Sequence, residues 1–224
     1  MTGIILAAGV GSRLGTDIPK GLMTLPDGET IIGRQVRILK KSGVDRIVLV
    51  VGYRQEMMQE RVTGVDFTYN PRYAETNTSK SLLCAIEDVD DDVLWVNGDV
   101  VFDEEIIPRI LAGNDNIILV NSAECGEEEV KYSADETGIV REISKQVKDA
   151  HGEALGVNLI RRKWLKRFAE ALEECDDNDY FERAVQLLID RGVNFEKLDV
   201  PDLKCIEVDF KEDWDRAQGM FGGE

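Results

Sequence analysis

Residues 3–15 of the chain read GIILAAGVGSRLG, an apolar run that opens directly into a glycine-rich loop. The run at 4–8 has the length of one buried strand, and Gly9, Gly11 and Gly15 follow it. Glycines after a strand leave backbone N–H groups open to phosphate oxygens, because no side chain stands in the way. The stretch therefore predicts an α/β fold that binds a phosphorylated ligand at the end of its first strand.

Strand-like and helix-like segments alternate through the first half of the chain. The predicted strands cover 2–8, 46–52, 65–69, 93–97 and 116–121, and the predicted helices cover 30–43, 53–62, 79–90 and 103–112. Thr30 is a suitable N-cap for the first of these helices, and Gly43 is a suitable stop. Such alternation predicts a mostly parallel, Rossmann-like sheet that is flanked by helices on both faces.

The pattern changes after residue 125. Residues 130–144, VKYSADETGIVREIS, predict two short strands around a turn at 135–138. Further strands are predicted at 154–160, 194–199 and 204–209, and further helices at 161–174, 180–191 and 211–219. No repeat, low-complexity segment or linker is evident in the sequence. We therefore predict one domain over 1–224, whose second half carries a small β insertion.

The charge and the cysteine pattern exclude several classes of protein. The chain has 27 basic and 44 acidic residues, and its formal net charge of −17 argues against nucleic acid as a partner. This acidity fits either plain solubility or a salt-rich habitat. The apolar runs are too short to cross a bilayer, so we expect no membrane insertion. The four cysteines show no CxxC spacing, and no apolar leader precedes the first strand, so we expect a cytoplasmic protein.

The glycine loop departs from the two most common phosphate-binding signatures. Leu14 stands where the Rossmann fingerprint has its third glycine, and Gly15 comes one residue late. A P-loop needs Gly-Lys-Ser/Thr, but Lys20 follows Pro19. A reductase with an irregular Rossmann loop and a generic strand-to-loop turn remain as alternatives.

Residues 6–25, LAAGVGSRLGTDIPKGLMTL, resemble the signature of the sugar- and alcohol-phosphate nucleotidyltransferases. In that family the Ala-Ala-Gly backbone lies against the base, and the glycine loop wraps the triphosphate. The resemblance implies nucleotide-binding roles for Leu6, Ala7, Ala8, Gly9, Gly11, Ser12, Arg13 and Lys20. It also implies that Arg13 and Lys20 are catalytic, because they would neutralise phosphate charge.

Residues 70–85, NPRYAETNTSKSLLCA, resemble the phosphocholine cytidylyltransferase branch of this family. The resemblance implies that Asn77 and Ser81 bind the nucleotide. Thr78 stands where the branch often has a second Asn. The alternative for the hydroxyl groups here is helix capping by Thr78 or Ser79.

Three carboxylates are implied as ligands of Mg²⁺. In VLWVNGDVVFD (93–103), Asp99 follows a predicted strand at the carboxyl edge of the sheet, whereas Asp103 suits a helix N-cap better. In CIEVDFKEDWDRA (205–217), Glu207 and Asp209 alternate along a strand and so share one face. The branch has a Glu-x-Asp pair here that completes its Mg²⁺ site. For Glu207, a solvent-facing strand position is the alternative.

The resemblance also implies an acceptor-binding side. Residues 143–160, ISKQVKDAHGEALGVNLI, look like the acceptor segment of the family, with Lys145 and Glu153 as polar candidates. Asp179 and Tyr180 fall where the branch places a carboxylate and an aromatic ring around choline, although a capping Asp and a core Tyr are equally compatible. Residues 1–121 would then form the nucleotide-binding half, and residues 122–224 the acceptor-side half.

Together these features predict a Mg²⁺-dependent transfer from a nucleoside triphosphate, with CTP favoured, to a phosphorylated small alcohol such as phosphocholine, releasing pyrophosphate and a CDP-alcohol. His151 is the only histidine, which argues against a Ser-His-Asp mechanism, and a phosphate dianion needs no general base. The alternatives are a uridylyl-, guanylyl- or thymidylyltransferase acting on a sugar 1-phosphate, and an inactive nucleotide-binding regulatory module. The sequence leaves a homo-oligomer open.

Overall fold

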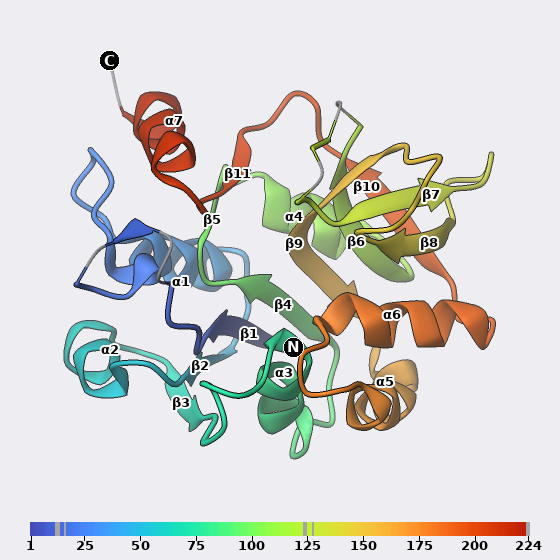
Figure 1. Ribbon diagram of the computed structural model, residues 1–224, viewed down its shortest axis with the longest axis horizontal. Coiled ribbons are helices and arrows are strands. Elements are labelled where there is room, and N and C mark those ends of the chain that lie inside the picture. Colours follow the sequence, from blue (N-terminus) through green and yellow to red (C-terminus); the bar gives the residue numbers. More distant parts are fainter. Residues whose placement is uncertain (12–13, 16, 123–124, 127, 223–224) are drawn as a thin grey trace.

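A twisted central sheet organises the molecule (Figure 1). The computed structural model describes residues 1–11, 14–15, 17–122, 125–126 and 128–222. The main strands are β1 (Thr2–Ala7), β2 (Arg46–Val51), β3 (Asp66–Tyr69), β4 (Val93–Asn97), β6 (Asn116–Asn121), β9 (Gly152–Ile160) and β10 (Phe195–Asp199). Their order is β10-β6-β9-β4-β1-β2-β3, and only β9 runs antiparallel to its neighbours in this order. The predicted, mostly parallel α/β sheet is confirmed.

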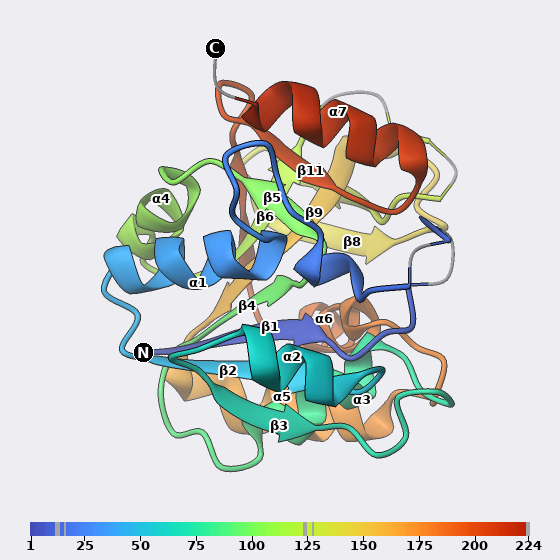
Figure 2. The ribbon, with the colours of Figure 1, turned by 90° about the vertical axis from the view of Figure 1, so that its left-hand side faces the viewer.

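Helices cover both faces of this sheet (Figures 1 and 2). One face packs against α3 (Thr78–Ile86), α5 (Arg162–Glu174) and α6 (Phe181–Asp190), and the other against α1 (Ile31–Lys41), α2 (Gln55–Arg61) and α4 (Ile106–Ala112). Successive strand residues therefore enter opposite cores, which is why the strands are apolar throughout instead of alternating with polar residues.

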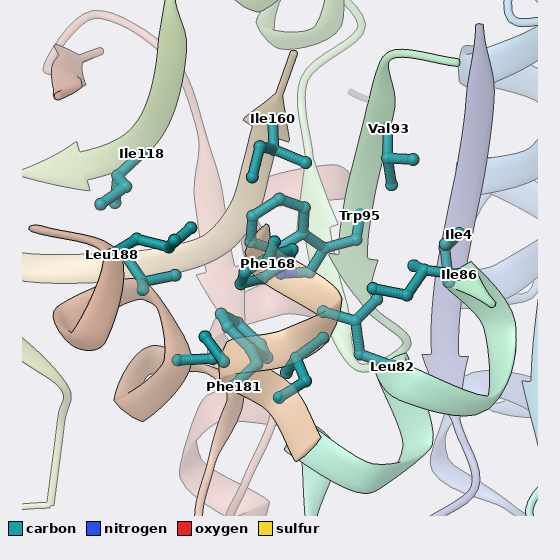
Figure 3. Packing of buried hydrophobic residues seen from close by; sticks show 14 of the residues in the cluster. Ile4, Leu82, Ile86, Val93, Trp95, Ile118, Ile160, Phe168, Phe181 and Leu188 are labelled. Atoms are coloured by element: carbon teal, nitrogen blue, oxygen red, sulfur yellow. The ribbon is translucent and has the colours of Figure 1, made fainter. Parts of the chain in front are cut away.

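Aromatic side chains fill the centre of the first core (Figure 3). Trp95 of β4 is fully buried, and its ring centroid lies 5.1 Å from that of Phe168 on α5 and 5.6 Å from that of Phe181 on α6. The Phe181 ring meets Trp95 edge-on, in the T-shaped geometry that aromatic pairs favour. The first turn of α6 is thereby fixed beneath the carboxyl end of β4.

A smaller layer lies beyond the carboxyl end of β4. Here β5 (Val100–Phe102) pairs antiparallel with β11 (Cys205–Glu207), and α7 (Lys211–Phe221) closes a third small core over them (Figure 2). The sequence did not predict β5 as a separate strand. Gly98 separates it from β4, because its N–H donates to the Leu6 carbonyl at 2.8 Å and turns the chain out of the sheet.

The predicted hairpin is confirmed as β7 (Lys131–Ala134) and β8 (Val140–Ser144), and it attaches to the sheet through β9. Asp135 stabilises the turn, since its carboxylate accepts hydrogen bonds from the N–H groups of Thr137 and Ile139. The hairpin therefore stands beside the sheet as a local unit, as its sequence pattern indicates.

The ends of the helices test the predicted caps. Thr30 caps α1 as predicted, because its hydroxyl accepts a hydrogen bond from Gly33 N at 3.0 Å, and Gly43 follows the helix with φ +83°. The prediction for Asp103 is wrong. Helix α4 begins at Ile106, and the Asp103 carboxylate instead accepts a hydrogen bond from Lys204 N, which belongs to the segment leading into β11.

Among the described helices, none has the length and apolarity required to cross a membrane.

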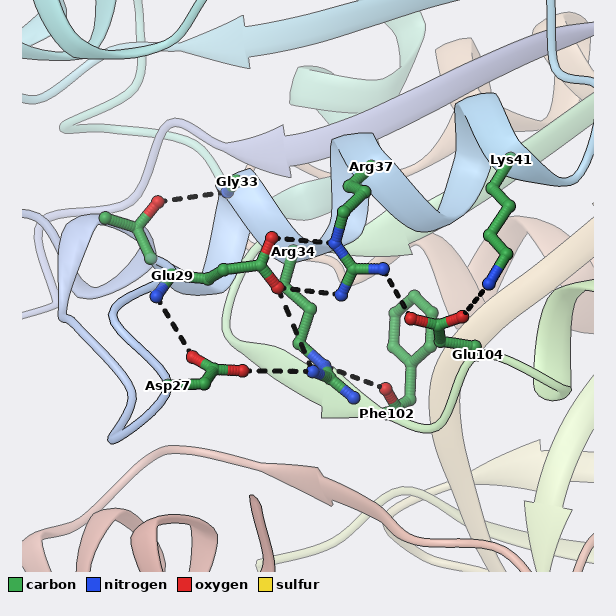
Figure 4. Close-up of polar contacts among 9 residues, drawn as sticks. Asp27, Glu29, Gly33, Arg34, Arg37, Lys41, Phe102 and Glu104 are labelled. Atoms are coloured by element: carbon green, nitrogen blue, oxygen red, sulfur yellow. Dashed lines mark hydrogen bonds and ion pairs between the residues drawn. The ribbon is translucent and has the colours of Figure 1, made fainter. Parts of the chain in front are cut away.

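An ion-pair network on α1 joins the loop before this helix to the segment after β5 (Figure 4). The Arg37 guanidinium donates to both carboxylate oxygens of Glu29, at 2.7 Å each, and also to Glu104. Lys41 adds a second hydrogen bond to Glu104, and Arg34 donates to the Phe102 carbonyl at 3.2 Å. Hydrogen bonds from Lys41 and Arg37 lower the pKa of Glu104 to about 2.

We expect Glu104→Gln to destabilise the protein slightly at neutral pH. The pKa of Glu104 is depressed in the folded state, so its charge stabilises the fold above the ordinary pKa of Glu, and this contribution disappears as the pH falls toward about 2. The side chain is 37% exposed, and solvent screening limits the loss to about 1 kcal/mol or less.

Calorimetric melting from pH 7 to pH 2 measures this effect. The curves of Tm against pH for the variant and the wild type should be separated at pH 7 and should meet near pH 2. Glu60→Gln, on an exposed position of α2, is the control. A separation that stays constant over the whole range would contradict the assignment.

Candidate active site

The loop after β1 begins at the carboxyl edge of the sheet. The Leu6 carbonyl accepts from Gly98 N at 2.8 Å, and the Ala8 carbonyl accepts from Tyr53 N at 3.1 Å. These bonds fix the end of β1 between β4 and the segment after β2. Leu6 and Ala8 are buried, Ala7 is half-buried, and Gly9 is exposed. The backbone predicted to meet a base and a triphosphate therefore opens onto the edge where ligands of α/β sheets bind.

Lys20 lies directly across this loop, in the short helix η2 (Lys20–Leu22). Gly11 has φ +61°, and a Cβ atom there would lie 2.9 Å from Cγ of Lys20, so only glycine allows this close approach. Ser12 and Arg13, which were predicted to bind the nucleotide, lie outside the described residues. The position of Lys20 is thus set by the glycine loop itself.

The Lys20 ammonium joins two carboxylates from distant parts of the chain. Its Nζ lies 2.6 Å from Oδ1 of Asp209 and 3.4 Å from Oδ2 of Asp99. The exposed fractions of the side chains are 11% for Lys20, 24% for Asp99 and 39% for Asp209. The structure therefore brings together three of the predicted site residues in one partly buried cluster.

This arrangement shifts the protonation equilibria of the cluster. Burial alone would lower the pKa of Lys20, but the charges of Asp99 and Asp209 and their hydrogen bonds outweigh it and raise the pKa. Burial also raises the pKa of Asp99, reinforced by the neighbouring charge of Asp209 and opposed by Lys20. The two carboxylates therefore require a cation between them, and Lys20 provides it in this structure.

A buried glutamine holds the turn that carries Asp99. Gln35 of α1 is 1% exposed, and its Nε2 donates to the carbonyls of Asn97 at 2.9 Å and Val100 at 2.7 Å, on either side of Gly98-Asp99. The sequence analysis missed Gln35. The available signal was a polar side chain on the apolar face of the predicted helix at 30–43.

Two further contacts place Asp209. Val208 N donates to the Asp99 carbonyl at 3.0 Å, which draws the segment after β11 against the β4–β5 turn. The Asp213 carboxylate then accepts hydrogen bonds from the N–H groups of Asp209 and Phe210, at 3.2 and 2.9 Å. Asp209 lies beyond the end of β11, so the hold of α7 on its backbone, and not strand geometry, aims it at Lys20.

Glu207 lies beside this cluster and bonds to Asn97, whose Nδ2 donates to Oε1 of Glu207 at 3.3 Å. Glu207 is exposed at the end of β11, as the solvent-facing alternative expected. The chain packed around its carboxylate, and then the charges of Asp99 and Asp209, nevertheless raise its pKa above the ordinary value. Within the described ranges, no three His, Cys, Asp or Glu side chains are gathered in a group that could hold a metal ion. A two-carboxylate set, Asp99 with Asp209, is what the cluster offers.

Asn77 and Ser81 are held in other contacts. Asn77 is the N-cap of α3, where its Oδ1 accepts from Thr78 N at 2.8 Å, so neither Thr78 nor Ser79 caps this helix. Ser81 is buried, and its hydroxyl accepts from Asn70 Nδ2 at 3.0 Å. Their nucleotide-binding roles stay predictions.

The start of α3 is joined to the segment before α6. Ser79 donates to the Asp179 carbonyl through both its N–H, at 3.3 Å, and its hydroxyl, at 2.7 Å. The Thr78 hydroxyl accepts from Phe181 N at 3.1 Å. The hydroxyl groups of Thr78 and Ser79, which the sequence analysis considered as helix caps, thus attach the start of α3 to the segment before α6.

Of the predicted acceptor residues, Lys145 and Tyr180 come together. Lys145 Nζ lies 5.2 Å from the centre of the Tyr180 ring, and that ring is 40% exposed and not part of the core. Asp179 is adjacent, but its carboxylate accepts from Asp176 N and so closes a local turn. Glu153, on β9, accepts a hydrogen bond from Asn121 at 3.3 Å, and burial raises its pKa.

One buried carboxylate escaped the sequence analysis. Glu182, in the first turn of α6, is 7% exposed, and its Oε2 has no hydrogen-bond partner among the described residues. Burial raises its pKa to about 7. In the sequence it looks like an ordinary acidic residue near a helix start, and only the packing of Phe181 beside it reveals that it is enclosed.

Comparisons with known proteins agree with this geometry. The profile of the MobA-like NTP transferase domain matches residues 3–187. The CMP-5'-(3-aminopropyl)phosphonate synthase of Streptomyces rubellomurinus is 31% identical over 97% of this chain, and the chain spans 38% of the length of that relative. The CTP:phosphoglutamine cytidylyltransferase of Campylobacter jejuni is 23% identical, with 95% of this chain and 97% of the relative covered.

A solved structure shows the same fold. The inositol-1-phosphate CTP transferase from T. maritima superposes with a TM-score of 0.83 at 20% identity, over 99% of this chain and 95% of the other. The predicted family, including its resemblance to cytidylyltransferases, is confirmed by the profile and the relatives together. The chain belongs to the family of the MobA-like NTP transferase domain.

Proposed function

We propose that this chain transfers a nucleotidyl group from a nucleoside triphosphate, CTP by preference, to a small phosphorylated or phosphonate acceptor. The observation that carries the proposal is the Lys20 ammonium between Asp99 and Asp209, directly beside the glycine loop. Support for CTP comes from the names of the two relatives, which specify CMP and CTP.

The chemistry follows from the charges. An oxygen of the acceptor's phosphate or phosphonate attacks the α-phosphorus of the triphosphate, the new P–O bond forms in line, and the bond to the pyrophosphate oxygen breaks. The attacking oxygen is already anionic, so no residue has to remove a proton from it. The difficulty is the repulsion between anions, and the protein lowers it by positioning and by positive charge.

Lys20 provides that charge at the end of β1. In the proposed reaction its ammonium turns from the two carboxylates toward the α-phosphate and the departing pyrophosphate. Arg13 would add a second cation from the glycine loop. The backbone of Lys20 is held in η2, and its side chain lies against Gly11. Rotation of the side chain alone would therefore move the ammonium toward the phosphates.

We further propose that Asp99 and Asp209 hold a Mg²⁺ ion when the nucleotide is bound. Their oxygens are the hard ligands that Mg²⁺ prefers, and Mg²⁺ commonly takes only one or two carboxylates together with substrate oxygens and water. The fit is supported by the pair's need for a cation, which Lys20 meets in this structure. The ion would neutralise charge on the substrates, and Glu207 would support the pair from the Asn97 side.

The acceptor would extend from this cluster toward the start of α6. Lys145 and Tyr180 lie there, and the bonds of Thr78 and Ser79 fix that region against α3. The acceptor would then lie between residues 1–121 and residues 122–224.

We expect Lys20→Ala to slow turnover on the order of 10²- to 10³-fold, because the lost charge acts mainly on the transition state. Nucleotide binding, measured by calorimetric titration with CTP, should weaken much less than turnover falls. Lys40→Ala, on the far end of α1, is the matched control. Turnover of Lys20→Ala within a few-fold of the wild type would contradict the catalytic role.

We expect Asp99→Asn and Asp209→Asn each to abolish most activity, with the double variant little worse than either single one, because two ligands of one ion act as a unit. Mn²⁺ binding, followed by electron paramagnetic resonance with CTP present, should be lost in each variant. Losses that multiply in the double variant, with Mn²⁺ binding retained, would show that the two carboxylates do not share an ion.

The substrate proposal is tested by a matrix of the four nucleoside triphosphates against phosphocholine, phosphoethanolamine, 3-aminopropylphosphonate, inositol 1-phosphate and glucose 1-phosphate. Pyrophosphate release is measured with Mg²⁺ and again with EDTA. CTP should lead with one of the first three acceptors, and EDTA should abolish the signal. A clear preference for UTP or GTP with glucose 1-phosphate would contradict the cytidylyl assignment, and bound nucleotide without turnover would favour a regulatory module.

A further inference from the structure

Two buried oxygen atoms near the proposed acceptor region have no donor among the described residues. They are Oδ1 of Asn97, at the end of β4, and Oε2 of Glu182, in the first turn of α6. Buried polar atoms are almost always hydrogen-bonded, and a buried acceptor without a donor costs free energy. The Asn97 oxygen and the ionised carboxylate of Glu182 both accept hydrogen bonds, so a ligand that satisfies them in this state must donate.

Both residues adjoin the contact between Trp95 and Phe181 in the first core. Trp95 and Asn97 are two residues apart on β4, so their side chains leave the same face of the sheet. The Phe181 ring packs against Trp95 on that face, with a centroid distance of 5.6 Å, and Glu182 is the next residue. Asn97 is therefore the next side chain on this face beyond Trp95, toward the carboxyl edge under which α6 begins.

Strand β8 runs along α6, the helix that carries Glu182. Gln186, one helical turn after Glu182, accepts from Ile143 N at 2.8 Å, so the end of β8 runs along α6. Lys145, two residues after Ile143, lies over the ring of Tyr180. Glu182 thus lies within electrostatic range of Lys145, and the acceptor is proposed to extend toward the Lys145–Tyr180 pair.

The charges around this position favour a cation. Glu182 lies within electrostatic range of Glu207, which is itself hydrogen-bonded to Asn97 at 3.3 Å. Among the described residues, Lys145 is the cation whose charge acts on Glu182, and it is also 3.7 Å from Glu128. A ligand that brings both positive charge and N–H donors would satisfy Glu182 and Asn97 at once.

We propose that Glu182 and Asn97 form a binding site for a primary ammonium group at the end of the acceptor remote from its phosphate or phosphonate. This inference rests on the proposed function and names its substrate class, an aminoalkyl phosphate or phosphonate. A primary ammonium has three N–H donors for the two oxygens, whereas a trimethylammonium group has none. A hydroxyl group donates but does not neutralise the carboxylate, so polyol phosphates fit less well.

Equilibrium binding distinguishes these acceptors independently of turnover. The ligands are 3-aminopropylphosphonate, its N,N,N-trimethyl derivative and butylphosphonate, in which a methyl group replaces the ammonium. Phosphoethanolamine with propyl phosphate repeats the comparison at the same chain length, with an ester oxygen in place of the methylene group next to phosphorus. Each ligand is titrated calorimetrically into the full chain, with and without the unreactive α,β-methylene analogue of CTP.

We expect at least one primary amine to bind tenfold or more tightly than its methyl isostere and its trimethyl derivative. In Glu182→Gln this preference should fall to threefold or less, because the charge is lost while the shape is kept, and binding of the isostere should stay unchanged. Glu60→Gln, on exposed α2, is the matched control and should keep the full preference. The Tm of Glu182→Gln should be equal to or above that of the wild type, because a buried unpaired charge is removed.

Three results would overturn the ammonium site, and the first two come from the binding measurements on the amines. Both amines could bind within threefold of their isosteres, or Glu182→Gln could keep the full preference. If the ammonium preference is present in binding while no triphosphate is turned over with any acceptor, the site stands and the proposed transfer reaction fails. If polyol phosphates are turned over as well as amines and bind equally well, the transfer reaction stands and the ammonium site fails.

Discussion

The ion pair that Lys20 makes with Asp99 and Asp209 links three segments that are far apart in the sequence. Two carboxylates so close to one another repel, and burial makes the repulsion stronger, so this edge of the sheet can close only around a cation. The surrounding structure is arranged for that purpose. Gln35 holds the turn that carries Asp99, Asp213 holds the backbone of Asp209, and glycine at position 11 lets the Lys20 side chain cross the loop.

The same cluster of Lys20, Asp99 and Asp209 would let an acidic chain bind the anionic substrates that are proposed for it. A formal net charge of −17 would repel a triphosphate at long range, but at physiological ionic strength the screening length is about 8 Å. Within that distance the local charges decide, and at the glycine loop Lys20 is the nearest described cation. In the proposed reaction, Asp99 and Asp209 would hold a metal ion in place of Lys20, and the ammonium would then be free to turn toward the phosphates. One side chain thereby stabilises the ligand-free site and, in the proposed reaction, the transition state.

The sequence predicts the sheet well because burial on both faces leaves a simple pattern. Continuous apolar runs such as 47–51 can only be strands covered on both sides, and the helices between them show clear periodicity. Strand β5 was missed because Gly98 bends the chain through a contact with Leu6, which lies more than ninety residues earlier. Asp103 was misassigned for a similar reason, since its partner is the backbone of Lys204. Long-range contacts of this kind leave no local signal.

The residues of the candidate site divide in the same way, into those with a local sequence signal and those whose role depends on long-range contacts. Lys20, Asp99 and Asp209 were identifiable because each follows a recognisable local pattern. Gln35, Asn97 and Glu182 were not, because their importance lies in which partners they have or lack after folding. Among the described residues, Gln35, Asn97 and Glu182 each keep a buried oxygen without a donor, and Gln35 bonds to the backbone of Asn97 at the carboxyl end of β4. A fold selected for stability alone would fill such positions with apolar side chains or paired groups. In the proposed ammonium site, the oxygens of Asn97 and Glu182 are ones that a substrate, and not the protein, would satisfy, and the core would give up stability there for binding.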